Sequence, residues 1–164
     1  MMSVRPAKPA DAGAIACIYN QGIDDRLATF ETTHRSADDV RAWFTATHPI
    51  VVVEDADGDA GGRIIAFAST SVYRPRECYR GVAEFSVYVC REARRRGAGR
   101  VAMHALFDAA RTAGFWKLVS RVFVENTASR GLLKAVGFRE VGTYEKHGQL
   151  DGVWRDTVIV ERLL

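Results

Sequence analysis

The sequence predicts a mixed α/β fold in which helices flank one central sheet. Some segments have apolar residues at every second position, whereas others repeat them at helical spacing. Along the 164 residues the order is strand, two helices, three strands, helix, strand, helix and two strands. Because this order is not a repeated strand–helix–strand series, we expect a mixed sheet. The length fits a single domain, residues 1–164.

The N-terminal half contains two expected helices. Pro9 and Asp11 mark the start of the first, which continues to residue 23. Ser36 caps the second, over residues 37–48, whose acidic first turn suits the helix dipole. The expected strands of this half are residues 3–5, 50–54, 63–71 and 82–89, and the expected loops are 27–33 and 72–81.

Residues 55–62, with the sequence DADGDAGG, join two of these strands. Their acidic and glycine-rich composition invites comparison with a calcium loop, but the twelve-residue ligand pattern that ends in glutamate is missing. We therefore interpret this segment as a hairpin turn.

The C-terminal half begins with an expected helix over residues 101–114, whose apolar residues recur at helical spacing. A strand over 117–124 follows. Asn126 is then placed to cap a helix over 127–138. Two further strands, 139–146 and 153–162, complete the sheet.

Composition argues against several functional classes. The 48% hydrophobic and 26% charged residues are typical of a soluble globular protein, and a net charge of +3 gives little reason to expect a nucleic-acid partner. No apolar run approaches the roughly 20 residues of a membrane span, and the N-terminus is too polar for a signal peptide. Cys17, Cys78 and Cys90 have neither disulfide nor metal-ligand spacing, so we expect a cytoplasmic protein without a metal site.

The most informative stretch is residues 82–99, VAEFSVYVCREARRRGAG. Alternation places Glu84, Ser86 and Tyr88 on one face of the expected strand and their apolar neighbours on the other. A carboxylate inside an otherwise apolar strand is unusual, so Glu84 is a candidate catalytic group. A structural salt bridge is the alternative role for this residue.

Arginines and glycines follow this strand and precede the next helix. Glycines at a helix N-terminus let backbone N–H groups converge on an anion, and arginine binds phosphate in a bidentate manner. The pattern predicts a polyphosphate-binding loop, although a G-x-G-x-x-A dinucleotide site and a loop of solvated arginines are alternatives. The residues concerned are Arg94, Arg95, Arg96, Gly97, Ala98, Gly99 and Arg100.

These motifs together resemble a known family. Arg94-x-x-Gly97-x-Gly99 after the strand EFSVYV, with Asn126 and Gly137-Phe138 downstream, is similar to the acetyl-CoA signature of the GNAT acetyltransferase superfamily. The resemblance implies a mostly antiparallel sheet of about six to seven strands with about four helices. It also implies that acetyl-CoA is the cosubstrate and that its acetyl group passes directly to an amine.

The resemblance further implies a role for each part of the stretch. The pyrophosphate lies on residues 95–100, and the pantetheine arm runs along the backbone of Val87, Tyr88 and Val89, where an N–H group polarises the thioester carbonyl. The side chain of Asn126 bonds the pantetheine, in addition to capping its helix. An amine attacks only when neutral, so a base is needed, and we expect burial to make Glu84 that base.

A subgroup of this family is also similar at the acceptor side. Arg76, Tyr79 and Glu84-x-x-Val-Tyr-Val match phosphinothricin acetyltransferases, as does Gly152-x-Trp-x-Asp156, whereas His147-Gly148 resembles their His-Gly but is displaced by a few residues. The implied acceptors are amino-acid analogues with a tetrahedral group, of the phosphinothricin, methionine sulfoximine or arsinothricin type, in a detoxification role. The implied quaternary state is a homodimer. The expected acceptor-binding residues are Phe30, Glu31, Arg74, Arg76, Glu77, Cys78, Tyr79, Phe85 and Ser86.

One departure from the family concerns the general acid. Many members carry a tyrosine four residues before the Gly-Phe pair, where this chain has Leu133, which cannot protonate a thiolate. Tyr144, a water molecule or unassisted departure of the thiolate are the alternatives.

Two other functions stay open at this point: acetylation of a protein N-terminus or lysine, and a catalytically silent CoA-binding module. Cys90 could be argued as a nucleophile, but no motif pairs it with a base.

Overall fold

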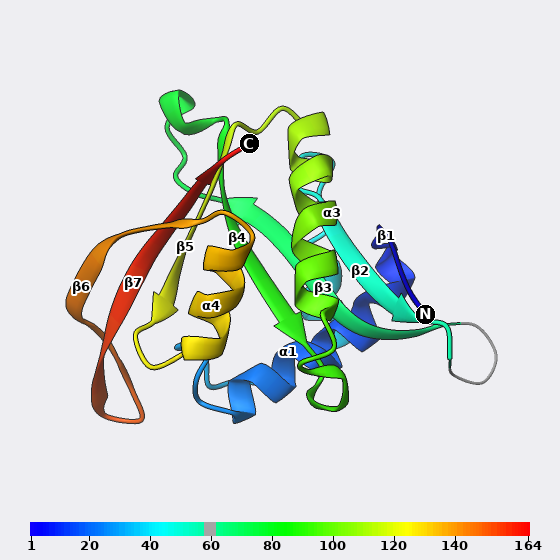
Figure 1. Cartoon of the computed structure of the whole chain (residues 1–164), viewed down its shortest axis with the longest axis horizontal. Helices are drawn as coiled ribbons and strands as arrows, with labels where there is room; N and C mark the ends of the chain where they lie inside the picture. Colours follow the sequence, from blue (N-terminus) through cyan, green and yellow to red (C-terminus); the bar gives the residue numbers. More distant parts are fainter. Residues whose placement is uncertain (58–61) are drawn as a thin grey trace.

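A computed structural model describes residues 1–57 and 62–164. Its strands form one sheet with the order β1-β2-β3-β4-β5-β7-β6 (Figure 1). Neighbouring strands are antiparallel except for β4 and β5, which are parallel. The mixed, mostly antiparallel sheet that the sequence predicts is confirmed. The strands are β1 (Met2–Pro6), β2 (Ile50–Asp55), β3 (Arg63–Val72), β4 (Val82–Val89), β5 (Lys117–Phe123), β6 (Arg139–Leu150) and β7 (Val153–Leu163).

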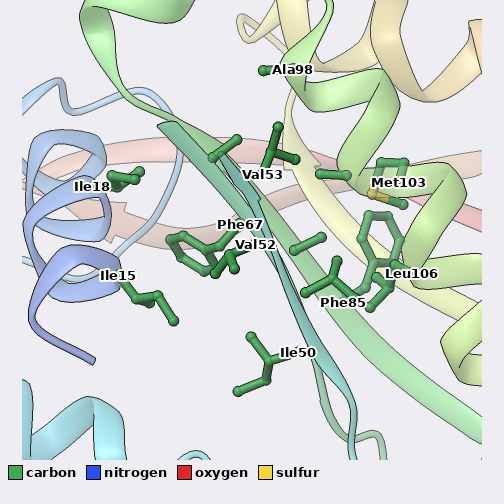
Figure 2. Close-up of a cluster of buried hydrophobic side chains, with 14 of the residues drawn as sticks. Ile15, Ile18, Ile50, Val52, Val53, Phe67, Phe85, Ala98, Met103 and Leu106 are labelled. Carbon is green, nitrogen blue, oxygen red and sulfur yellow. The ribbon is translucent and has the colours of Figure 1, made fainter. Parts of the chain in front are cut away.

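Helices cover both faces of this sheet. Helix α1 (Ala12–Asp24) packs on one face, and α3 (Ala98–Thr112) packs on the other, with α4 (Thr127–Ala135) beside it (Figure 1). Figure 2 shows Ile15 and Ile18 of α1 facing Phe67 on one side of the strands, and Met103 and Leu106 of α3 beside Phe85 on the other. Since both faces are buried, the central strands are apolar on both sides.

The second helix is shorter than expected. Helix α2 spans Ala37–Arg41, with the predicted Ser36 cap, whereas the sequence pattern predicted a helix to residue 48. One tertiary contact and one local hydrogen bond accompany the end of this helix. Trp43 packs edge-on against Tyr19 of α1, and the Thr45 hydroxyl accepts a hydrogen bond from the His48 N–H at 3.1 Å. A side chain that bonds nearby backbone competes with helix continuation.

Strands β4 and β5 separate soon after they meet. They pair only where Val82–Glu84 lie opposite Lys117–Val119, and beyond that point they diverge (Figure 1). The Cys90 N–H donates to the Ile65 carbonyl of β3 at 2.8 Å. Because hydrogen-bonded and non-bonded positions alternate in an antiparallel pair, the backbone groups of Val87 and Val89 face away from β3, toward the gap.

The segment that joins β2 to β3 is described only in part. Asp55 lies opposite Arg63 in an antiparallel pair, as a hairpin requires. The predicted turn itself includes residues 58–61, which lie outside the described residues. Within residues 1–57 and 62–164, no helix has the length and apolar character needed to cross a membrane.

Candidate active site

A large cavity occupies the fork between β4 and β5. Its volume is about 1180 Å³, and its walls include parts of β4, β5 and α4, the end of α1, and residues 27–30, 93–95, 97–100 and 147–148. Tyr19 and Gly22 of α1 line it from one face of the sheet, and Gly99 and Leu132 line it from the other. The cavity therefore passes through the sheet, so two reactants could meet in it from opposite faces.

One end of the cavity is the glycine-rich turn before α3. Gly97 has a φ of 88°, a left-handed conformation that favours glycine, and it occupies the N-cap position of α3. The first N–H groups of α3 are thereby presented at a positive helix end. Of the predicted loop, the residues that line the cavity are Arg94, Arg95, Gly97, Ala98, Gly99 and Arg100.

Arg96 differs from its neighbours. Its guanidinium pairs with Asp55 at the end of β2 at 2.7 Å, and it is not among the described residues of the cavity wall. Arg95, by contrast, has a φ of 64° and lines the cavity. The three consecutive arginines thus take different directions, which a linear motif cannot distinguish.

Asp25 connects this turn to α1. Its two carboxylate oxygens lie 2.7 Å from Arg91 and 2.6 Å from Arg94. Partial burial acts to raise the pKa of Asp25, but the hydrogen bonds from the two arginines outweigh it and hold the pKa below its usual value. Asp25 therefore fixes the position of the turn and neutralises part of its charge.

Asn126 caps α4 as the sequence predicts. Its side-chain oxygen accepts from the Ser129 N–H at 3.2 Å, and its amide nitrogen donates to the Leu27 carbonyl at 3.3 Å. Asn126, Val87, Tyr88 and Val89 all line the cavity. The capping role is thus confirmed, and the pantetheine contact stays a prediction.

Glu84 stands at the point where the fork opens. Its carboxylate pairs with Arg121 of β5, with 3.0 Å between Oε1 and Nη2, and both side chains line the cavity. The expectation of a buried carboxylate was wrong, because 31% of the Glu84 side chain is exposed to the open fork. The salt bridge considered as its alternative role is present, and it leaves the carboxylate accessible from the cavity.

Arg121 was missed by the sequence analysis. It lies two residues after Val119, which pairs with Glu84, so both side chains project from the same face of the sheet. Its Nη1 atom is 3.4 Å from Nε2 of His147, whose ring stacks on Tyr144 at 4.6 Å. The sequence does show a charged residue inside each of two expected strands, Glu84 and Arg121. Recognising them as a pair required knowing that these strands are neighbours in the sheet, which the sequence did not establish.

The predicted acceptor-binding residues divide into two groups. Phe30, Phe85 and Ser86 line the cavity, and Phe30 also packs edge-on against Phe123. Glu31 instead pairs with Arg35 at 2.9 Å. The remaining residues lie in an exposed loop and are not among the described residues of the wall, so their role stays a prediction: Arg74, Arg76, Glu77, Cys78 and Tyr79.

Leu133 occupies the position at which many family members carry a general-acid tyrosine. Leu133 is 1% exposed and lines the cavity, whereas Tyr144 is 44% exposed and does not line the part of the cavity that the structure describes. Tyr88 does line it, and burial raises the pKa of its phenol. Cys90 is only 2% exposed, and burial raises the pKa of its thiol, so it is not an accessible thiolate nucleophile.

The described residues contain no candidate metal site. In residues 1–57 and 62–164, no group of three or more His, Cys, Asp or Glu side chains is arranged to hold a metal ion. The charged groups of the described cavity wall are instead arginines and two carboxylates, Glu84 of β4 and Asp25 after α1. A forked sheet with an arginine- and glycine-rich turn at one end and a carboxylate at the fork defines an acetyltransferase of the GNAT class.

The chain belongs to the Acetyltransferase (GNAT) family, whose model matches residues 19–138. It is 34% identical over 163 residues to a methionine sulfoximine/methionine sulfone acetyltransferase of Pseudomonas paraeruginosa, covering 97% of this chain and 92% of that protein. It is 30% identical over 169 residues to a phosphinothricin N-acetyltransferase of Streptomyces coelicolor, covering 99% and 96%.

A solved structure agrees with these relatives. The chain superposes on a phosphinothricin acetyltransferase of Sinorhizobium meliloti in complex with acetyl-CoA, with a TM-score of 0.89, 29% identity and coverage of 99% and 88%. The resemblance noted in the sequence is thereby confirmed. The protein is an acetyl-CoA-dependent N-acetyltransferase.

Proposed function

We propose that this enzyme acetylates the α-amino group of a small amino acid or analogue that carries a tetrahedral polar group in its side chain. Methionine sulfoximine, methionine sulfone, phosphinothricin and arsinothricin belong to this substrate class, and acetylation would detoxify such compounds. Support comes from the names of the two relatives, which match the chain almost end to end. The observation that carries the proposal is the Glu84–Arg121 pair at the fork of the cavity.

The cavity fits acetyl-CoA as the first substrate. Backbone N–H groups at a helix start and the side chains of Arg95 and Arg100 are suited to a pyrophosphate. The backbone groups of Val87 and Val89 face the gap, as an extended pantetheine arm requires, although the Val89 carbonyl also accepts a hydrogen bond from Arg94 Nε at 3.4 Å. Acetyl-CoA supplies a thioester, whose carbonyl a backbone N–H here can polarise.

Glu84 is the proposed base of the transfer. It accepts a proton from the amine, directly or through one water molecule, so that the neutral nitrogen can form the new C–N bond. The C–S bond breaks and its electron pair leaves with the CoA sulfur as a thiolate, while the acylated nitrogen releases its remaining extra proton to solvent to give the neutral amide. Leu133 cannot protonate that thiolate, so the chain relies on another donor or on release of the anion.

A thiol-release assay over a panel of amines tests this proposal. The panel contains methionine sulfoximine, methionine sulfone, phosphinothricin, ordinary amino acids, polyamines and peptides. We expect the analogues to give the highest kcat/KM, since each has a free α-amino group beside a carboxylate and a compact polar side chain. Reaction of only peptides or polyamines would contradict the proposal and favour protein acetylation.

We also propose a homodimer, with the β6 edge as the first surface to test. Strand β6 ends the sheet, and the β6–β7 hairpin exposes Val141, Tyr144, Val153 and Trp154. Exposed apolar side chains on an edge strand favour association. Sedimentation should show a dimer for the wild type and a shift toward monomer for Val141→Lys. A wild-type monomer would contradict the homodimer.

A further inference from the structure

We infer that Arg121 is the carboxylate receptor of the acceptor site: it binds the α-carboxylate of the amino acid and so presents the α-amine to Glu84. This inference rests on the proposed function and adds the residue that selects free amino acids. It is drawn from the pairing of Arg121 with Glu84 inside the cavity and from the direction in which both side chains project.

Arg121 is separated from the other arginines of the cavity. Among the described residues, four arginines line the wall, and three of them, Arg94, Arg95 and Arg100, belong to the turn before α3. Arg121 comes from β5 and projects from the same face as Glu84. Ser71 pairs with Glu84 from β3, and Ser86 follows it two residues later, so this face also supplies hydroxyl groups.

The guanidinium retains capacity for a ligand. Arginine has five N–H donors, and within the described residues Arg121 contacts only Glu84 through Nη2 and His147 through Nη1. Its side chain is 47% exposed in a cavity, where a carboxylate can approach it. The Glu84 carboxylate on one side and the His147 ring on the other hold the guanidinium in place before a substrate arrives.

The spacing of the two groups matches an α-amino acid. The amine and carboxylate of such a molecule are attached to one carbon atom, so their receptors must be adjacent. Glu84 Oε1 and Arg121 Nη2 are 3.0 Å apart. An amino acid bound beside this pair would place its amino nitrogen next to the Glu84 carboxylate and its own α-carboxylate next to the Arg121 guanidinium. A peptide N-terminus has no carboxylate at that position.

The alternative is that Arg121 acts only by positioning Glu84. In that case its removal would slow every acceptor equally. Recognition of a carboxylate would instead slow only acceptors that carry one. The two roles are therefore separated by comparing L-methionine sulfone with its carboxamide, which keeps the amine and the side chain but lacks the negative charge.

The experiment measures kcat/KM for both compounds with the wild type, Arg121→Gln and Arg121→Lys. We expect Arg121→Gln to reduce the acid-to-amide preference by about 10- to 100-fold, mainly through KM for the acid, because a charge-assisted pair is lost. Arg121→Lys should restore part of the preference, since it keeps the charge. Arg111→Gln is the matched control: Arg111 is 46% exposed, pairs with Asp108 on α3, and should leave the preference unchanged.

An unchanged acid-to-amide preference in Arg121→Gln would overturn the inference and leave Arg121 as a positioning residue for Glu84. The proposed function would survive that result, because the acid would still be acetylated. A wild-type protein that acetylates neither compound would overturn both. Calorimetric titration with acetyl-CoA is the folding control for Arg121→Gln. Because the substitution leaves the CoA end unaltered, the folded variant should bind acetyl-CoA as the wild type does.

Discussion

The two ends of the cavity are built in different ways. The CoA end comes from one continuous stretch of chain, residues 94–100 without the Arg96 side chain, and this stretch includes the start of helix α3. The acceptor end is assembled from separate strands and loops: Glu84 from β4, Arg121 from β5, His147 from β6 and Phe30 from the segment after α1. A local motif can encode the first end, whereas the second exists only once the sheet has formed.

The largest effect is expected at the fork. Glu84→Gln removes the proposed base and should lower kcat/KM for the acceptor by roughly 10²- to 10⁴-fold near neutral pH, in steady-state kinetics. Acetyl-CoA affinity should change little, because the CoA end is separate. Glu140→Gln is the control, since Glu140 is also a strand glutamate paired with an arginine, Arg130, but does not line the described cavity. Loss of acetyl-CoA binding in Glu84→Gln would show that the two ends are not independent.

The next effect is expected at the CoA end. Gly97→Ala forces a side chain into a left-handed conformation at the start of α3, so acetyl-CoA should bind about tenfold more weakly in calorimetry. Gly114→Ala is matched to it, because Gly114 also has a positive φ and, like Gly97, has no neighbouring atom within 4 Å of the position that a Cβ would take. Both variants should lose about 1 kcal/mol of stability. If both bind acetyl-CoA as the wild type does, the turn is not the anion site.

A smaller effect should appear where α1 holds the turn. Asp25→Asn removes the ion pairs with Arg91 and Arg94 and should lower the free energy of unfolding by about 1 kcal/mol at pH 7. The folded pKa of Asp25 is depressed, so its stabilisation is fully present above the unfolded pKa of about 4 and is lost as pH falls through the folded value.

Chemical denaturation of Asp25→Asn and the wild type between pH 7 and pH 3 measures this dependence. The difference between the two proteins should shrink at the acid end of the range. A difference that stays constant across the range would assign the loss to packing rather than to the ion pairs.

The smallest effect is expected for Tyr144→Phe. The side chain of Tyr144 is 44% exposed and stacks on His147 without lining the described cavity. Turnover should therefore fall by less than about twofold, since the ring that holds His147 is kept. A fall of tenfold or more in kcat would instead make Tyr144 the general acid in place of the family tyrosine.

The contrast between the two ends also explains what the sequence could predict. The fold class, the Gly97 turn and the Asn126 cap depend on periodicity and on local backbone chemistry, and each was found. The Glu84–Arg121 pair depends on a contact between distant segments, as does the packing of Trp43 on Tyr19 at the early end of α2, and neither feature was predicted. The loop at residues 74–79 was assigned by resemblance, and its residues are not among those that line the described cavity, so that assignment stays a prediction.

The central claim is that Glu84 takes the proton from the acceptor amine, and the pH dependence of kcat/KM tests it most directly. In the wild type, kcat/KM should rise with pH along a curve shaped both by the ionisation of the α-amine, whose usual pKa is about 8, and by proton transfer to the enzyme base. Glu84→Gln should retain only the ionisation of the amine. A variant whose pH profile has the same shape as that of the wild type would contradict the account and remove Glu84 from the mechanism.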